Sequence, residues 1–400
     1  MRIGVLGPFN PSAIKDFLAD SQVPSINESA TAVNTLVREF LLMGHEVKVF
    51  SWYSIDRHKT MELKGKNVEV YLIPSRPNKK VPFVLNPLLW PRRISSVVGE
   101  YVDSLDVLHA HWTYEYAKAA SCFSRVLPVF VTVRDWCPYQ FSVSVGSERI
   151  YWMWKYWIFR RVMADRRITF IANSQYTQRM IIGHYSKIEA PVVFNPIDKS
   201  WILDSKKKPF AHQIISIADG LCSNRKNIGK LLEAFAEYRQ TFPDARLHLV
   251  GKYDRKANRF RLWKQRGWID SVKFYGAVPH AQLDALLDEM SVLVHPALEE
   301  TFGNILIEAM ARCVPCIGGD RSGAVPEVLG FGKYGLLCDI NDSHSICQAM
   351  MQLEDSSLRS GLVTNATAML KSFCSSDVVA AQHVVLYQKA VAAWPRREHE

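Results

Sequence analysis

Short apolar segments alternate with stretches of helical periodicity along the chain. In the first half, RIGVLGP at residues 2–8 predicts a strand, and residues 30–43 carry apolar side chains at the spacing of an amphipathic helix. Gly44 suits a helix C-cap, and the EVKVFSW that follows predicts the next strand. This βαβ order predicts a parallel sheet. Further strands are expected at VEVYLIP, DVLHAHW, VFVTVRD and ITFIANS.

The second half repeats this alternation after a stretch that has no clear apolar period. Strands are expected at IISIADG, RLHLVG, VKFYGAV, SVLVHPA, VPCIGG and YGLLCDI. The predicted class is therefore α/β, with two Rossmann-like, doubly wound domains facing across a cleft and ligands at the carboxyl ends of the strands. The expected boundaries are a domain at 1–198, a linker at 199–212, a domain at 213–375 and a C-terminal helix, within 376–400, that crosses back to the first domain.

Composition narrows the class of partner. The chain has 400 residues, of which 48% are hydrophobic, and this is enough for two domain-sized cores. A formal net charge of +10 favours a polyanionic partner, such as nucleic acid, a phosphorylated substrate or an anionic membrane surface. The eight cysteines show neither zinc-ligand spacing nor a disulfide framework, which fits a reducing cytoplasm. The N-terminus predicts a strand rather than a signal peptide, and no apolar run is long enough to span a membrane.

Two carboxylates stand out in the segment SVLVHPALEETFGNILIEAMARCVPCI, residues 291–317. Glu300 follows an expected strand and Glu308 lies about one turn into the next expected helix, with Gly303 between them. A helix N-terminus offers free N–H groups to an anion, and a carboxylate can accept two hydrogen bonds from adjacent hydroxyls such as a ribose diol. The alternative is structural: Glu300 caps the helix and Glu308 pairs with Arg312 at i, i+4.

The pattern E-T-F-G-x₄-E, followed by AMA, a VP pair and SGAVPEVL, resembles the signature of the GT4 family of retaining glycosyltransferases. The resemblance is strong over residues 215–345 and weaker before them, where GHEVKVFS, DVLHAHW, IANSQYT and NPID follow in the family's order. It implies the GT-B architecture, with an N-terminal acceptor-binding domain and a C-terminal nucleotide-sugar-binding domain.

The resemblance also implies roles for residues of the second domain. Glu308 corresponds to the carboxylate that holds the nucleotide ribose, and Glu300 to the one that touches the transferred sugar. Lys226 corresponds to the lysine that grips the diphosphate, where it would neutralise charge on the leaving group; the alternative is a solvated lysine at a helix start. The remaining donor-side candidates are the backbone around Phe302, Gly303 and Asn304, the loop with Gly323 and Glu327, and Arg225. Glu327 fits equally well as a first-turn helix residue.

One departure from the family concerns the diphosphate. The family usually has an arginine shortly before the lysine, whereas this chain has Gly220 or Leu221 at that place. Arg225, next to Lys226, is the candidate substitute.

In the first domain, His109 and His111 end an expected strand, and alternation puts both on one face. His111 resembles the family's active-site histidine, which contacts the transferred sugar, although a strand-end histidine can also be structural. Arg134 and Asp135 stand where the family often has histidine and aspartate, and they are the acceptor-side candidates.

The predicted function is therefore that of a retaining, metal-independent glycosyltransferase. It would move a hexose from a nucleotide diphosphate sugar to a glycan or lipid-linked glycan, in bacterial lipopolysaccharide or exopolysaccharide synthesis. No D-x-D triplet is present, and neither a metal nor another cofactor is expected. The alternatives are an epimerase or a phosphorylase on the same fold, and a non-catalytic nucleotide-sugar binder.

The segment IYWMWKYWIFRRVMADRR, residues 150–167, bears on location. Its aromatic and arginine side chains favour a membrane interface with anionic lipid, and the alternative is a core helix with a basic outer face. We expect a cytoplasmic protein, with an anionic membrane surface at the inner face of the cytoplasmic membrane as a candidate partner. No nucleic-acid module is recognised, so nucleic acid is not expected as a partner.

Overall fold

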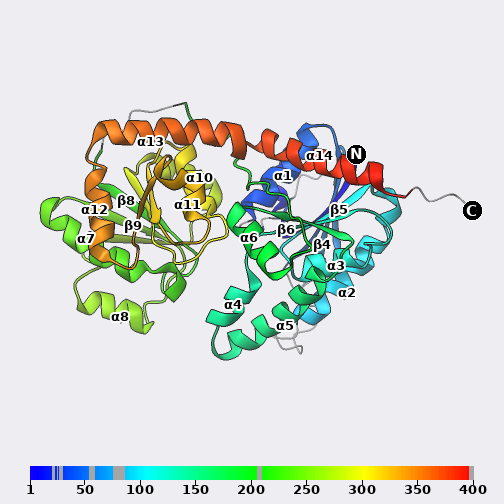
Figure 1. Cartoon of the computed structure of the whole chain (residues 1–400), viewed down its shortest axis with the longest axis horizontal. Coiled ribbons are helices and arrows are strands. Elements are labelled where there is room, and N and C mark those ends of the chain that lie inside the picture. The colour runs from blue at the N-terminus through cyan, green and yellow to red at the C-terminus, as the bar shows by residue number, and fades with distance from the viewer. Residues whose placement is uncertain are drawn as a thin grey trace, which may run out of the picture. The chain divides into compact units, whose positions relative to one another are not determined.

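The computed structural model describes residues 1–19, 23, 24, 26, 30–53, 59–74, 86–204 and 210–395. The chain divides into two compact units (Figure 1). Unit 1 comprises Met1–Pro196 and Ser376–Glu400, and unit 2 comprises Ile197–Ser375. The C-terminal helix thus belongs with the N-terminal half of the chain. The segment 199–212, expected to be a linker, is grouped with unit 2, and its residues 205–209 lie outside the described residues.

In the described part of unit 1, seven strands form one sheet in the order β3-β4-β2-β1-β5-β6-β7. The strands are β1 (Arg2–Leu6), β2 (Glu46–Tyr53), β3 (Met61–Gly65), β4 (Val68–Pro74), β5 (Val107–His111), β6 (Val129–Val133) and β7 (Ile168–Ala172). All neighbours pair in parallel except β3, which pairs antiparallel with β4. Six of these strands were predicted from the sequence. The sequence analysis missed β3, a five-residue edge strand in which Met61 and Leu63 alternate with the charged Glu62 and Lys64.

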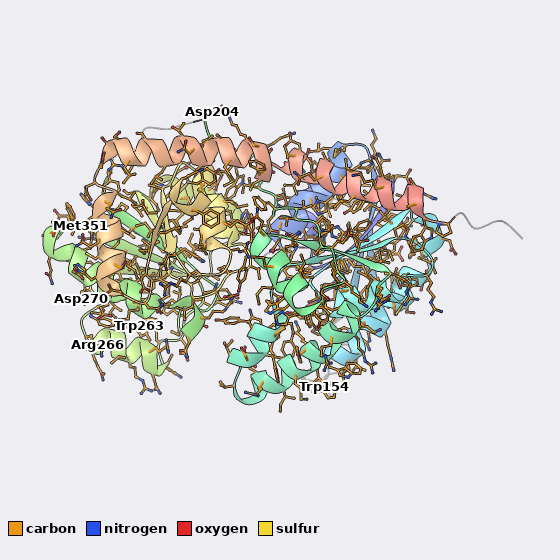
Figure 2. All side chains as sticks on the ribbon, in the orientation of Figure 1. Trp154, Asp204, Trp263, Arg266, Asp270 and Met351 are labelled. Carbon is orange, nitrogen blue, oxygen red and sulfur yellow. The ribbon has the colours of Figure 1, made fainter. Side chains whose placement is uncertain are left out.

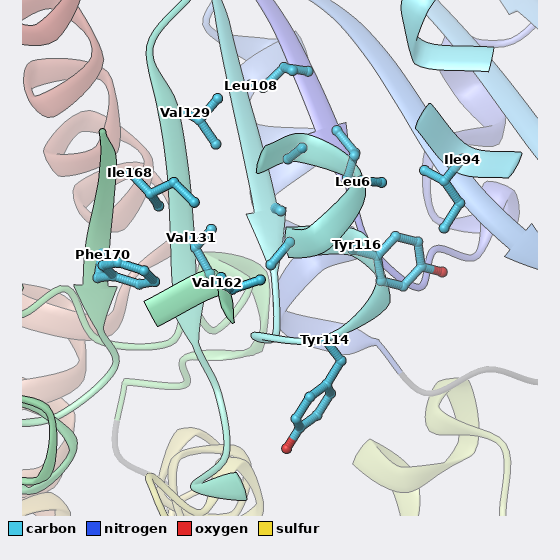
Figure 3. Close-up of a cluster of buried hydrophobic side chains, with 14 of the residues drawn as sticks. Leu6, Ile94, Leu108, Tyr114, Tyr116, Val129, Val131, Val162, Ile168 and Phe170 are labelled. Atoms are coloured by element: carbon cyan, nitrogen blue, oxygen red, sulfur yellow. The ribbon is translucent and has the colours of Figure 1, made fainter. Parts of the chain in front are cut away.

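Helices cover both faces of this sheet. They are α1 (Thr31–Leu42), α2 (Asn86–Gly99), α3 (Glu115–Ser121), α4 (Cys137–Val143), α5 (Gly146–Met163), α6 (Gln175–His184) and α14 (Ser376–Ala393). Figure 3 shows Leu108, Val129, Val131, Ile168 and Phe170 gathered on one face of β5–β7. On the other face, Tyr387 and other apolar residues of α14 join a core that includes α1. Helix α14 is therefore an integral part of the unit 1 core.

In the described part of unit 2, six parallel strands form a sheet in the order β10-β9-β8-β11-β12-β13. The strands are β8 (Gln213–Ile217), β9 (Arg246–Val250), β10 (Val272–Gly276), β11 (Val292–His295), β12 (Cys316–Gly319) and β13 (Leu336–Cys338). The helices are α7 (Ile228–Thr241), α8 (Asn258–Gln265), α9 (Leu283–Asp288), α10 (Asn304–Ala311), α11 (Val325–Val328), α12 (Ser343–Gln352) and α13 (Ser356–Met369). All six strands were predicted from the sequence.

In each sheet the strand that comes first in the sequence lies in the middle, and the direction in which successive strands are added reverses beside it. In unit 1 the reversal lies between β1 and β5, and in unit 2 it lies between β8 and β11. Ligands of doubly wound sheets bind at the carboxyl ends of the strands at this topological switch point. The α/β class with two parallel-sheet domains is confirmed, and the switch points mark where functional residues are expected.

Candidate active site

The switch point of unit 2 brings Lys226 and Glu300 together. Lys226 ends a short 3₁₀ helix (Asn224–Lys226) after β8, and Glu300 lies in the loop between β11 and α10. The backbone N–H of Leu298 donates to the carbonyl oxygen of Arg225 at 2.9 Å, which ties the two loops to each other. Adjacent parallel strands have thus placed side chains that lie 74 positions apart in the sequence at one edge of the sheet.

A largely buried ion pair results. The Nζ of Lys226 lies 2.5 Å from Oε1 of Glu300, and Nε2 of His295, the last residue of β11, lies 3.4 Å from the same oxygen. Burial alone would raise the pKa of Glu300, but the charge of Lys226 and the neighbouring His295 hold that pKa well below its ordinary value. Glu300 is therefore a carboxylate at any physiological pH, and an ammonium group faces it.

Gly323 fixes the backbone of Glu300. The N–H of Ala324 donates to the carbonyl oxygen of Glu300 at 2.8 Å, and Gly323 has a φ of +63°. A Cβ atom at position 323 would lie 2.3 Å from that same carbonyl oxygen, so only glycine fits without a backbone shift. Glu327 follows in the first turn of α11, with a half-buried side chain.

Helix α10 begins beside Glu300 without a side-chain cap. Its N-cap is Gly303, with a φ of +87°, and its first residue is Asn304. The N-cap residue is Gly303 and not Glu300, so the structure does not support the alternative in which Glu300 is the N-cap of this helix. Phe302 is buried. A helix N-terminus carries a partial positive charge, which suits an anion.

Glu308 projects from the second turn of α10 and is 7% exposed. Its Oε1 lies 3.3 Å from Nε2 of His280, and the ring of Trp201 stacks on His280 with centroids 4.7 Å apart. Arg312, the partner considered for Glu308, instead donates through Nε to Oδ1 of Asp288 at 2.9 Å. Sequence reasoning missed His280 and Trp201, because neither belongs to a motif and they lie far apart in the chain.

Gly220 and Leu221, at the start of the loop after β8, stand where the family usually has an arginine. Gly220 has a φ of +77°, a conformation that favours glycine, and the side chain of Leu221 is buried in the unit 2 core. Neither position supplies a cation to this loop. Arg225 is half-buried, and its backbone carbonyl holds Leu298 as described above.

The switch point of unit 1 holds neutral rings and a guanidinium. His111 is the last residue of β5 and is fully buried. Arg134 follows β6 and donates to Nδ1 of His111 from Nε at 3.2 Å and from Nη2 at 3.1 Å. Its Nη1 donates to Oδ1 of Asn195 at 2.6 Å. Asp135 accepts a hydrogen bond of 2.7 Å from the hydroxyl of Tyr114.

His109 lies on the same face as His111, as alternation predicted, with ring centroids 4.2 Å apart. Its Nε2 lies 2.7 Å from Oγ1 of Thr132 and its Nδ1 lies 2.5 Å from the hydroxyl of Tyr387 in α14. Burial lowers the pKa of both histidines well below the ordinary value, so both imidazoles are neutral at pH 7. Sequence reasoning assigned no role to Asn195 or Tyr387; only the position of Asn195 in the quoted NPID segment hinted at one.

Among residues that the structure describes, no group of three or more His, Cys, Asp or Glu side chains is arranged to hold a metal ion. No helix in the same part of the chain is long and apolar enough to cross a membrane.

Comparison with known proteins gives two family matches that follow one another along the chain. The family described as "Glycosyltransferase Family 4" matches residues 29–201, and "Glycosyl transferases group 1" matches residues 202–369. Together they extend over both switch points.

Similar proteins include enzymes and a solved structure. N-acetyl-alpha-D-glucosaminyl L-malate synthase of Bacillus anthracis is 34% identical over 164 residues, and O-antigen chain mannosyltransferase B of Escherichia coli is 29% identical over 191 residues. These matches cover 40% and 44% of this chain, and 42% and 47% of the relatives. The structure of sucrose-phosphate synthase from Thermosynechococcus elongatus aligns with a TM-score of 0.76 at 16% identity, over 98% of this chain and all of that one. This similarity supports the GT-B fold.

Proposed function

The chain belongs to the GT4 family of glycosyltransferases, and on that premise we propose that it transfers a hexose, with retention of configuration, from a nucleotide diphosphate sugar to a glycan or lipid-linked glycan. The observation that carries the proposal is the Lys226–Glu300 ion pair at the switch point of unit 2. The loop that contains Glu300 leads directly into α10, the helix that contains Glu308. The same loop arrangement provides a cation for a diphosphate and carboxylates for hydroxyl groups.

The donor would bind in unit 2. Glu308 is buried and ionisable, and it can accept both hydroxyl hydrogens of a ribose diol once His280 moves aside or shares the carboxylate. The N-terminus of α10, at Gly303 and Asn304, carries the partial positive charge of a helix start, which favours phosphate oxygens. Lys226 supplies the positive charge that stabilises the diphosphate as it leaves. Gly323 holds the backbone of Glu300 and His295 contacts its carboxylate, and together they would keep Glu300 oriented toward the sugar.

The reaction needs one bond broken and one formed. The bond between the anomeric carbon and the diphosphate oxygen breaks, and the acceptor hydroxyl oxygen bonds to the anomeric carbon from the same face. The acceptor proton passes to the departing phosphate oxygen, so no side chain has to act as a covalent nucleophile. Lys226 supplies the positive charge for the leaving diphosphate, which supports the proposal of metal-independent transfer. Arg134 and Asp135 remain the candidate acceptor-side groups of unit 1.

The setting we propose is bacterial surface polysaccharide synthesis at the cytoplasmic face of an anionic membrane. The similarity to an O-antigen chain mannosyltransferase supports this setting, as does an exposed surface on α4 and α5. We define the α5 surface by the exposed apolar residues Val143, Val145, Ile150, Met153 and Trp157 and the neighbouring Arg149, Arg160 and Arg161. Trp154 lies on the same helix (Figure 2).

The core-helix alternative describes one side of α5, and the membrane-interface alternative is proposed for its other side. Ile158, Phe159, Val162 and Met163 face the core, so the C-terminal half of α5 is a core helix on one side. On its other side Trp157 is 42% exposed, and the guanidinium of Arg161 lies 3.7 Å from the centre of its ring. Exposed tryptophan next to arginine complements an anionic interface, where the ring takes the headgroup level and the cations meet phosphate.

Sedimentation with vesicles tests the membrane part. Vesicles with a third of anionic phospholipid should bind the protein at low salt, and vesicles of zwitterionic lipid should not. The double variant Met153→Ser/Trp157→Ser should weaken binding at least tenfold. A matched pair of exposed apolar substitutions on unit 2, Leu262→Ser/Phe331→Ser, should leave it unchanged. Equal binding of both double variants would remove the α5 surface from the proposal.

Thermal unfolding with nucleotides tests the donor part. UDP, GDP and ADP, each with and without a sugar, are added to the wild type and to Glu308→Ala. A ligand at one hundred times its dissociation constant stabilises the native state by about 2.7 kcal/mol, which raises the melting temperature by about 5 °C or more. We expect one nucleotide to give this shift in the wild type and to lose most of it in the variant.

Nucleotide release with added acceptor glycans then separates the functions. Acceptor-dependent release supports transfer, and a product whose anomeric configuration matches that of the donor supports retention. Binding without release under any acceptor would identify a nucleotide-sugar binder, and consumption of the donor without acceptor would identify an epimerase or phosphorylase. No thermal shift with any nucleotide would contradict the donor proposal itself.

A further inference from the structure

Two histidines on one face of β5 differ in how their nitrogens are used. Both nitrogens of His109 have partners, Thr132 at Nε2 and Tyr387 at Nδ1. His111 has a partner only at Nδ1, where Arg134 donates twice. The Nε2 of His111 is buried, and no polar atom of the described residues lies within hydrogen-bond reach of it. His109 is therefore satisfied within the fold, whereas His111 has one ring nitrogen left over.

The Arg134 contact determines where the proton of His111 lies. A guanidinium group has N–H donors and no acceptor, and although burial lowers the pKa of Arg134 to about 10, it stays charged at neutral pH. Both of its N–H groups converge on Nδ1, so Nδ1 must present its lone pair. In a neutral imidazole the proton is then on Nε2.

Burial and the neighbouring charged groups all disfavour a second proton on His111, at Nδ1. It would place an N–H directly against the guanidinium of Arg134 after β6. His109 on the same strand and His383 on α14 add repulsion whenever they are charged, and the ring is buried. Tyr387 lies on α14 too, but its hydroxyl is engaged with His109. Burial first, and these neighbours next, keep the pKa of His111 well below its ordinary value.

The unpartnered N–H has a position that suits a ligand. A buried polar group without a partner is costly, and native proteins keep such groups chiefly where a ligand or a reaction uses them. His111 ends β5 at the switch point, and a Cβ atom at Gly7, in the loop after β1, would lie 3.4 Å from both Cβ and Cδ2 of His111. The ring edge that carries Cδ2 and Nε2 therefore lies along this loop, at the edge of the sheet where ligands bind.

We infer that Arg134 is a positioning residue that locks His111 as a neutral donor, with its Nε2–H offered to a hydroxyl oxygen of the substrate. His111 then takes no proton during transfer, since Nε2 already carries one and Nδ1 is held by the guanidinium. This inference rests on the proposed function and deepens it: it assigns a hydrogen-bonding role to His111 and leaves the acceptor proton to the departing phosphate oxygen. It also gives Arg134 a role other than acceptor binding.

Nitrogen NMR tests the locked tautomer without any substrate. The full chain is labelled with ¹⁵N-histidine, and the His111 signals are identified by their loss in His111→Gln. In the wild type we expect Nδ1 unprotonated and Nε2 protonated, with no change between pH 8 and pH 5.5. In Arg134→Met the ring should lose its fixed tautomer and titrate with a pKa closer to the ordinary value. Wild-type His111 with its proton on Nδ1, or with an ordinary titration, would overturn the inference.

Kinetics test the donor role. The side-chain amide of glutamine reaches the position of Nε2 and donates, whereas that of asparagine stops at the position of Nδ1. His111→Gln should therefore retain about tenfold more kcat/KM than His111→Asn, a difference that one hydrogen bond to substrate can supply. Equal losses in both variants would overturn the donor role.

The pH profile of transfer separates positioning from a general structural loss. Arg134→Met should add an acidic limb, so that kcat/KM falls tenfold per pH unit once His111 becomes charged, and Arg134→Lys should partly restore the flat profile. A uniform loss at every pH in both variants would speak for a structural role and against the inference. If no donor is turned over by the wild type, the proposed function fails, while the NMR result still decides the tautomer.

Discussion

The two switch points have the same topology and opposite chemistry. In unit 2, adjacent parallel strands bring a lysine and a glutamate into a buried ion pair, and both groups carry full charges. In unit 1, adjacent parallel strands bring the neutral imidazole of His111 against the guanidinium of Arg134. The topology fixes only where side chains meet. A charged pair suits a diphosphate whose charge grows during the reaction, whereas a neutral donor suits a sugar hydroxyl.

The largest expected effect comes from breaking the charged pair. Lys226→Met should lower kcat by about 10²–10³, because the charge that stabilises the leaving diphosphate is lost. It should also lower the free energy of unfolding of unit 2 by about 3 kcal/mol, since the Glu300 carboxylate is left largely buried without its main partner. Steady-state kinetics and urea unfolding measure the two effects.

The matched variant is Lys226→Met/Glu300→Gln. With both charges removed, most of the lost stability should return while activity stays low, because the stability loss comes from the unpaired carboxylate. If the double variant were as unstable as Lys226→Met alone, the pair would not be the cause of the instability. If Lys226→Met kept wild-type kcat, the charge would not act on the leaving group.

The next effect tests the backbone that holds Glu300. Gly323→Ala places a Cβ atom against the Glu300 carbonyl oxygen and forces a residue with a Cβ to adopt a φ of +63°. We expect about 2 kcal/mol of lost stability and a fall in kcat of at least tenfold, because the Glu300 loop must shift. Urea unfolding measures the loss of stability, and steady-state kinetics measure the fall in kcat.

Gly44→Ala is the control for backbone strain in this experiment. Gly44 has a φ of +81°, but a Cβ atom there would have nothing within 4 Å. This variant should lose about 1 kcal/mol of stability through strain alone and keep full activity. An equal loss of kcat in both variants would show that strain, and not contact with Glu300, causes the effect.

The fold could be predicted from the sequence because it depends on local periodicity. Among the described residues, twelve of the thirteen strands appear in the sequence as apolar runs between helical segments, and the short edge strand β3 was not predicted. Motif residues of unit 2, such as Lys226 and Glu300, lie together as their positions after neighbouring strands implied. Their roles in binding and catalysis remain predictions.

The site contacts could not be predicted in the same way, because they join residues from unrelated positions. The contact of Arg134 with His111 depends on the register of β5 against β6, and the contact of Tyr387 with His109 depends on the docking of α14. The stack of Trp201 on His280 joins two loops that share no motif. None of these contacts leaves a periodic signal in the sequence.

Acid should weaken unit 1 before it weakens unit 2. Among the described residues, unit 1 has four histidines with lowered pKa values, His45, His109, His111 and His383, and unit 2 has one, His248. A histidine whose folded pKa is lowered stabilises the native state above its unfolded pKa, and this stability is lost as the pH falls below about 6.5. Burial, the largest cause, lowers the pKa of His383 to about 4, so this residue alone can account for about 3 kcal/mol.

The stability that the Lys226–Glu300 ion pair gives to unit 2 depends on pH in a more acidic range. The folded pKa of Glu300 is lowered, so this stability is present above the ordinary carboxyl pKa and is lost only below about pH 4.5. Pulse proteolysis in urea at pH 7, 6, 5 and 4, with the peptides assigned to each unit by mass spectrometry, measures both. We expect the midpoint for unit 1 to fall more steeply than that for unit 2. Parallel declines would mean that the buried histidines of unit 1 do not control its acid stability.

The smallest effect separates the two histidines of β5. Tyr387→Phe removes the hydroxyl that lies 2.5 Å from Nδ1 of His109 and leaves that buried nitrogen without a partner. We expect a loss of about 1–2 kcal/mol in the free energy of unfolding of unit 1 and less than a threefold change in kcat/KM. The ring of Tyr387 contributes most of its packing to the core and is kept by phenylalanine.

The ring centroids of His109 and His111 are only 4.2 Å apart, so this variant distinguishes the roles of two neighbouring histidines. If His109 serves the fold and His111 serves the substrate, unfolding in urea should report the Tyr387→Phe change and kinetics should not. The opposite pattern, with activity lost and stability kept, would mean that the hydroxyl acts on the substrate through His109 and His111 as one chain. The distinction between a satisfied and an unsatisfied histidine would then no longer separate structure from function in unit 1.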